Sequence, residues 1–193
     1  MAHDDATSRR RKRTPRPLDK GRLEELALAY VARFATSAGK LEAYLRRKLR
    51  ERGWDGEDEA PVADLVARFV EKNYVDDEVY GRAKAQGLLS RGYGARRVEE
   101  ALRAAAIGED LRGTLAPGES ERREAAVALA RRRSFGPYGA PLPRDAEAAR
   151  KLREKRLAAM LRAGHDFDAA RRVLEAATVE ELETWVAESQ NGE

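Results

Sequence analysis

The sequence predicts an all-α protein, built as an elongated array of three tandem three-helix bundles with an extra C-terminal helix. Three observations lead to this prediction. Alanine, leucine, arginine and glutamate, which are all good helix formers, dominate the 193 residues. Apolar residues recur at the spacing of helix faces, and no convincing alternating β-branched run is found. Segments of similar pattern also return at nearly constant intervals.

Five segments are expected along the chain, divided where the composition and the helix signals change. The N-terminus is polar and basic, and the prolines near its end favour an extended arm. A bundle is expected to end near a glycine, a proline or a capping residue. The segments are a disordered basic arm (1–17), three-helix repeats at 18–73, 74–117 and 118–177, and a C-terminal capping helix and tail (178–193).

In the first bundle, helices are predicted over residues 18–34, 39–52 and 61–72. Thr36 or Ser37 is expected to cap the second of them, because a short hydroxyl side chain can accept a hydrogen bond from a helix start. Apolar residues follow helical spacing in all three segments. The side chains expected to face inward are Leu23, Leu26, Ala27, Tyr30, Val31, Phe34, Leu41, Tyr44, Leu45, Leu49, Val62, Leu65, Val66, Phe69 and Val70.

The second bundle begins with two helices joined by a tight glycine corner at residues 92–94. Asp76 or Asp77 is expected to cap the first helix, and Gly92 to adopt the left-handed turn that ends it. The second helix is predicted over residues 95–106. A short third helix follows, with apolar contacts from Ile107, Leu111 and Leu115.

The third bundle is predicted to contain helices at residues 119–133 and 144–162, and a short helix capped by Asp166. Thr178 and Glu181 have the spacing of a capping box, which predicts the start of the final helix. That helix is expected to cover the open end of the array.

The predicted second helices of the bundles support a tandem repeat. Leu45, Leu102 and Leu157 occupy similar places in them and follow one another at intervals of 57 and 55 residues. Each bundle of about 50 residues should be about 25 Å across, so three in line should span roughly 70 Å.

The charge is distributed unevenly. The chain carries a net charge of +4, yet residues 1–22 alone hold eight Lys or Arg and three Asp, so the rest is almost neutral. Any affinity for nucleic acid must therefore come from this arm or from local faces. Residues 9–13 suit either a solubilising tail or a phosphate-binding arm.

Catalytic and metal-binding patterns are poor. The chain has no cysteine and two histidines, of which His165 is interpreted as a surface or turn residue. Residues 76–78 form an acidic cluster that suits helix capping better than metal binding. We therefore expect no enzyme activity, no cofactor and no metal. No apolar run approaches the length that spans a bilayer, so a cytoplasmic location without membrane contact is expected.

Basic residues recur on the predicted second helices and form the candidate binding site. If the bundles stack in one orientation, these groups make a periodic stripe that suits a long acidic partner. The corner at 92–94 is interpreted as a tight turn with solvated arginines, or as a helix start that holds an anion. The candidate binding residues are Arg46, Arg47, Lys48, Arg50, Arg91, Arg96, Arg97, Arg103, Arg153, Lys155 and Arg156.

Four pieces of the chain together resemble the RecX family of bacterial regulators of the RecA recombinase. In chain order they are residues 45–54, residues 74–78, the Arg-Gly-Tyr-Gly corner at 91–94, and residues 156–164. The resemblance covers about residues 23–174. It departs from the family pattern at 104–106, where three alanines replace a polar helix end, and at 165–166.

The resemblance implies three tandem three-helix repeats and binding in the groove of the RecA–single-stranded DNA filament. It further implies inhibition of RecA ATP hydrolysis, strand exchange and coprotease activity, and hence a role in DNA repair, homologous recombination and the SOS response. Binding to single-stranded and double-stranded DNA is also expected, by a monomer. The alternative is a stand-alone DNA-binding helical protein, acting as a transcriptional or nucleoid regulator.

Overall fold

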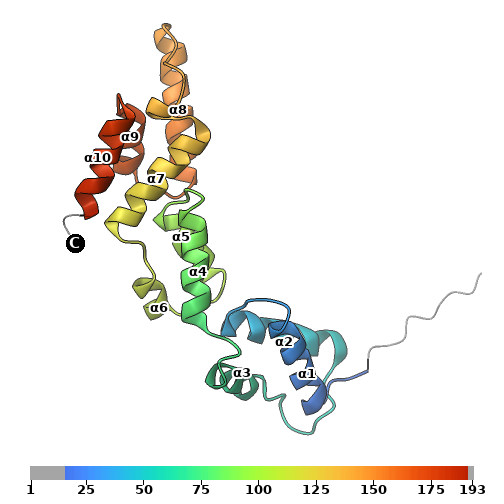
Figure 1. Cartoon of the computed structure of the whole chain (residues 1–193). Coiled ribbons are helices and arrows are strands. Elements are labelled where there is room, and N and C mark those ends of the chain that lie inside the picture. The colour runs from blue at the N-terminus through green and yellow to red at the C-terminus, as the bar shows by residue number, and fades with distance from the viewer. Residues whose placement is uncertain (1–15, 191–193) are drawn as a thin grey trace, which may run out of the picture.

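The computed structural model describes residues 16–190, and the basic run at 9–13 lies outside them. The chain is all-α, as predicted, and the helices form an elongated body (Figure 1). An isolated bridge between Leu18 and Trp54 is the β pairing within the described range. The elements are α1 (Lys20–Val31), α2 (Ala38–Arg52), α3 (Val62–Glu71), α4 (Asp77–Leu89), α5 (Ala95–Arg103), α6 (Glu109–Thr114), α7 (Glu119–Arg133), the 3-10 turn η1 (Gly136–Tyr138), α8 (Ala146–Arg162), α9 (Phe167–Glu175) and α10 (Val179–Gln190).

The helix starts follow the capping signals of the sequence. Ser37 caps α2, Asp76 caps α4 and Asp166 caps α9, each by accepting a backbone N–H three residues ahead. At α10, Thr178 accepts from the backbone N–H of Glu181, while the Glu181 carboxylate accepts from Ala177. The Glu181 carboxylate therefore accepts the N–H of Ala177, the residue before Thr178, instead of the Thr178 N–H that the predicted capping box would use.

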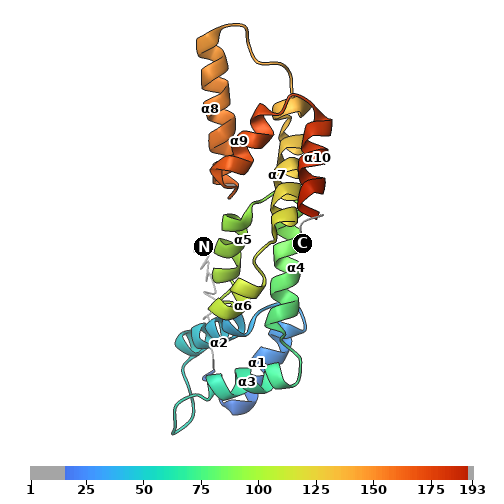
Figure 2. The same cartoon turned by 90° about the vertical axis from the view of Figure 1, so that its left-hand side faces the viewer.

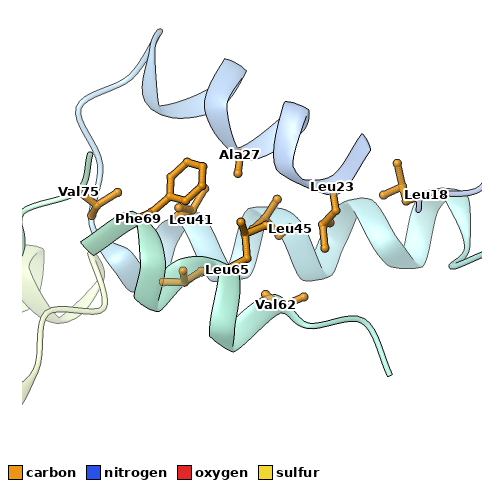
Figure 3. Packing of buried hydrophobic residues seen from close by; sticks show 10 residues of the cluster. Leu18, Leu23, Ala27, Leu41, Leu45, Val62, Leu65, Phe69 and Val75 are labelled. Carbon is orange, nitrogen blue, oxygen red and sulfur yellow. The ribbon is translucent and has the colours of Figure 1, made fainter. Parts of the chain in front are cut away.

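The buried side chains form three clusters along the body. The first lies among α1, α2 and α3 and contains Leu23, Leu41, Leu45, Leu65 and Phe69 (Figure 3). The second lies around α4 and α5, and the third around α7, α8, α9 and α10. Fully burying one such side chain stabilises the fold by about 1.5–3 kcal/mol. Each group of helices therefore depends on its own small core.

Helix α7 connects the second and third clusters. Ala125 packs in the second cluster, and its neighbour Ala126 packs in the third. Gly92, at the end of α4, lies so close to α7 that an added Cβ would stand 2.6 Å from the Leu129 backbone nitrogen. Its φ of 77° is the left-handed turn expected there. The exact limits of the three repeats stay a prediction.

Several sequence-based expectations about buried faces were wrong. Phe34 lies beyond the end of α1 and is 54% exposed, and Val70 is 43% exposed on the outer side of α3. Helix α5 ends at Arg103 instead of residue 106, because Ala106 adopts a left-handed φ of 55°. On α8, Met160 and Leu157 both pack in the third cluster, where Met160 is fully buried and Leu157 is half-buried.

Candidate nucleic-acid and protein interface

The start of α5 meets the end of α8. The backbone N–H of Gly94 donates to the Ala163 carbonyl at 2.9 Å, and that of Arg96 donates to the Gly164 carbonyl at 3.2 Å. The Arg96 guanidinium also donates to the Leu161 carbonyl at 2.8 Å. Unpaired N–H groups at a helix start and unpaired carbonyls at a helix end are thus satisfied together. We call this contact the α5/α8 joint.

This joint bears on two expectations. The start of α5 was one candidate for holding an anion, and two N–H groups there, those of Gly94 and Arg96, donate to the carbonyls of Ala163 and Gly164; anion binding at this corner stays a prediction. His165 is a buried residue and not a surface one, and its Nε2 lies 3.0 Å from the Gly92 carbonyl. Burial lowers the pKa of His165, although the hydrogen bond to Gly92 and the charge of Asp166 oppose this effect.

The start of α2 meets the end of α5 in a comparable way. Ser37, which is fully buried, donates its hydroxyl to the Ala105 carbonyl. The backbone N–H of Ala38 donates to the Asp77 carboxylate at 2.7 Å, so the second aspartate of the acidic cluster links α2 to α4. Gly39 fits closely against Ala106, since an added Cβ would lie 2.5 Å from the Ala106 Cβ. We call this contact the α2/α5 joint.

The two joints place α8, α5 and α2 end to end. The end of α8 abuts the start of α5, and the end of α5 abuts the start of α2. In Figure 2, α5 lies below α8 along one side of the body, and α2 lies crosswise at the lower end of the same side. These are the helices that carry ten of the candidate binding residues, so we call the basic residues of α2, α5 and α8 the basic row. Arg91 lies outside it, after α4, where its Nε donates to the Gly87 carbonyl.

On α2 and α5 most of the basic row is paired with acids of the same helix. Arg46 bonds Glu42 at 2.8 Å, and Arg47 and Lys48 share Glu51. The hydrogen bond from Lys48 lowers the pKa of Glu51, so this carboxylate is charged at neutral pH. Surface pairs of this kind contribute only about 0.2–1 kcal/mol. Such cations can exchange their intrahelical acid for a partner's carboxylate or phosphate at small cost.

On α5 the same arrangement continues beside a hollow. Arg96 and Arg97 share Glu100, and Arg103 bonds Glu99 at 3.0 Å. Arg96 and Arg103 line a hollow of about 440 Å³ between α5 and α6. Sequence reasoning missed Arg112, whose half-buried guanidinium bonds Glu99 and the Ile107 carbonyl and so holds α6 against α5.

On α8 the basic row is least neutralised. Within residues 16–190, Arg153, Lys155 and Arg156 have no acidic partner within 4 Å, and the same is true of Arg50 on α2. Arg153 and Arg156 line a larger groove together with Arg150 and Arg171. Arg171 comes from α9, and nothing in the local sequence pattern could have assigned it to this place.

The described residues assemble no metal site. In residues 16–190 no group of three His, Cys, Asp or Glu side chains is placed to hold a metal ion. Across the same range, no helix has the length and apolar character to cross a membrane. The described residues do form the basic row, with the two hollows beside it.

Comparison with known proteins identifies the family. No family model matches the sequence. The regulatory protein RecX of Myxococcus xanthus is 30% identical over 180 residues, which cover 89% of this chain and 94% of that protein. The regulatory protein RecX of Thermus thermophilus is 35% identical over 106 residues, covering 55% of this chain and 70% of that protein. The chain belongs to the RecX family of regulatory proteins.

A solved structure agrees in fold. The crystal structure of RecX from Lactobacillus salivarius matches with a TM-score of 0.61 at 16% sequence identity. The match covers 86% of this chain and 97% of that one, so nearly the whole helical array is shared.

Proposed function

We propose that the protein binds in the groove of the RecA–single-stranded DNA filament and inhibits RecA ATP hydrolysis, strand exchange and coprotease activity. Membership of the RecX family supports RecA as the partner. The observation that carries the proposal is the end-to-end order of α8, α5 and α2, because it spreads basic residues along one side of an elongated body. A long acidic polymer is the partner that such a surface fits.

The inhibition is steric and electrostatic in this proposal. Arginine and lysine side chains of the basic row pair with carboxylates of the filament and with DNA phosphates. A body held across several RecA subunits resists the rearrangements that ATP turnover requires. The protein acts without catalysis or cofactor, as a cytoplasmic monomer built from three helical repeats and a capping helix.

The test is RecA ATP hydrolysis on single-stranded DNA with this protein added at a substoichiometric ratio. We expect turnover to fall in a dose-dependent way, and to fall less at higher salt, because exposed charges are screened. Unchanged turnover at micromolar concentration would refute the proposal. Saturable binding to duplex DNA without any effect on RecA would favour the stand-alone DNA-binding alternative instead.

A charge-reversal variant tests the basic row itself. Arg47→Glu, Arg97→Glu and Lys155→Glu change one cation on each of the three helices, and none of these side chains contributes a bond to either joint. We avoid Arg96, because its reversal would also break the bond to Leu161. Inhibition should weaken by at least about tenfold, since each reversal costs roughly 1 kcal/mol at an exposed contact.

The matched control carries the same charge change away from the basic row. Arg68→Glu and Lys72→Glu at the end of α3, with Arg82→Glu on α4, alter exposed side chains. The control should inhibit RecA nearly as well as the unchanged protein. Equal losses in both variants would mean that total charge, not the basic row, governs binding.

A further inference from the structure

A groove of about 820 Å³ lies between α8, the end of α9 and the loop that follows η1. Figure 1 shows α8 projecting beyond the rest of the body, and Figure 2 shows its far half set apart from α7 and α10. Four arginines line the groove: Arg150, Arg153, Arg156 and Arg171. The groove is therefore an open, cationic hollow at one end of the basic row.

Two of the four arginines pair with an acid, and two do not. Arg150 lies 3.9 Å from Glu154, and Arg171 lies 3.4 Å from Glu175, each pair within one helix. Among the described residues, no carboxylate stands within 4 Å of Arg153 or Arg156. The net charge of the lining is therefore positive, which calls for an anionic occupant.

The rest of the lining is aliphatic. Leu142, Leu157 and Leu174 come from the loop, α8 and α9, and Pro137 and Pro141 stiffen the loop wall. A wall with fixed backbone angles loses less conformational entropy when a ligand binds. The Arg156 guanidinium lies 5.9 Å from the Phe135 ring, which helps to hold it at the edge of the groove.

We propose that this groove binds a short acidic segment of a partner polypeptide. An apolar side chain of that segment sits among the leucines, and its carboxylates pair with Arg153 and Arg156. Paired Arg–carboxylate contacts next to an apolar pocket are typical of a binding anchor. This inference rests on the proposed function in one respect, since the protein subunits of the filament are then the source of the segment.

The lining argues against a nucleic-acid strand as the occupant. Single-stranded nucleic acid is held by aromatic side chains on which bases stack, and no aromatic residue lines this groove. Glu154 and Glu175 interrupt the positive charge of the lining, so an evenly charged phosphate backbone would meet repulsion that a segment with separately placed carboxylates can avoid. A segment with separate carboxylates and an apolar side chain fits this mixed lining better.

Fluorescence anisotropy with the full chain tests the proposal without RecA. The probe is a labelled peptide with a Leu-Phe pair flanked on both sides by Asp, and the comparison peptide has Asn in place of each Asp. We expect the acidic probe to bind and the Asn comparison peptide not to bind. The variant Arg153→Glu should weaken its binding by about tenfold, because a close attraction becomes a repulsion. Leu142→Ser should weaken it independently.

The matched control is Lys151→Glu, which makes the same charge change on the same helix but outside the groove. It should leave the affinity within about twofold. Equal binding of both peptides, or equal effects of Arg153→Glu and Lys151→Glu, would overturn the proposal. The proposal would also be overturned if oligothymidylate displaced the probe and Arg153→Glu weakened the binding of that strand. Sedimentation showing that the groove mediates self-association would overturn it as well.

The outcomes separate this proposal from the proposed function. RecA inhibition without peptide binding would refute the groove proposal alone. Peptide binding that depends on Arg153, with RecA turnover unchanged, would refute the proposed function alone.

Discussion

At the scale of single residues, His165 shows how a polar group can help to hold two distant parts of the chain together. Its ring is buried, and its Nε2 contacts the Gly92 carbonyl, 73 positions away in the sequence. A carbonyl only accepts hydrogen bonds, so Nε2 carries a proton and Nδ1 is deprotonated in the neutral ring. Burial disfavours a second proton and lowers the pKa of His165.

This lowered pKa predicts a pH-dependent stability. As the pH falls below about 6.5, the unfolded chain takes up a proton at His165 while the folded chain resists it, so the free energy of unfolding decreases. The variant His165→Gln keeps an N–H donor but does not titrate, so this pH-dependent loss of stability should be absent from it. Urea unfolding of both proteins at about pH 7.5 and about pH 5.5 measures the difference. An equal loss of stability in both proteins would contradict the prediction.

Gly94 is a second residue on which the α5/α8 joint depends. A Cβ there would lie 2.5 Å from the His165 backbone nitrogen, so Gly94→Ala should destabilise the fold by about 1–3 kcal/mol. Gly87, inside α4, has no atom within 4 Å of the place of an added Cβ. Gly87→Ala should therefore stabilise the protein by about 0.5–1 kcal/mol. Thermal unfolding of the two variants checks the opposite signs.

At the scale of elements, the capping residues and the glycine that ends α4 were predictable because their signals are local. Ser37, Asp76 and Asp166 act within three residues of the helices they start, and Gly92 ends α4 through its own φ. What a residue does across the fold was not predictable. The bond from Ser37 to Ala105 spans 68 positions, and no local pattern specifies it.

The same limit applies to the candidate interface. The basic groups of α2, α5 and α8 could be found by their recurrence in the sequence, but the order of these helices in space comes from contacts between helix ends that are far apart in the chain. Phe34 was misplaced because helical spacing was extended past Val31, where α1 ends. Arg171 was missed because only the packing of α9 on α8 brings it to the groove.

Asp77 provides the prediction at this scale. Its carboxylate accepts the backbone N–H of Ala38 and so links the start of α2 to α4. Asp77→Ala should cost about 1–2 kcal/mol, because it leaves that N–H unpaired in the α2/α5 joint. Glu78→Ala changes a neighbouring exposed acid that pairs with Arg82 on the surface, and it should cost much less. Chemical denaturation of both variants measures the difference.

At the scale of the whole molecule, three separate cores imply uneven stability. The buried residues of the first cluster all lie within residues 18–75, whereas α7 belongs to both the second and the third. In arrays of this kind each unit is stabilised by itself and by its neighbours only. The first unit is therefore expected to open without the other two.

Leu65→Ala tests this expectation. Leu65 is buried in the first cluster, and its truncation should cost about 2–5 kcal/mol there. Hydrogen exchange followed by mass spectrometry should show faster exchange in α1, α2 and α3, with α7 to α10 nearly unchanged. An equal rise along residues 16–190 would show that the chain opens as one cooperative unit.

The helix-to-helix joints have one more consequence. Backbone carbonyls, N–H groups and close-fitting small residues such as Gly39 and Gly94 make most of these contacts, and the Arg96 guanidinium adds one bond to the α5/α8 joint. Each joint fixes where one helix begins relative to the end of another, through bonds that tolerate little displacement. The separation between the cation groups of α2, α5 and α8 should therefore stay nearly constant, and a partner with a different spacing of negative charges would match only one of these groups at a time.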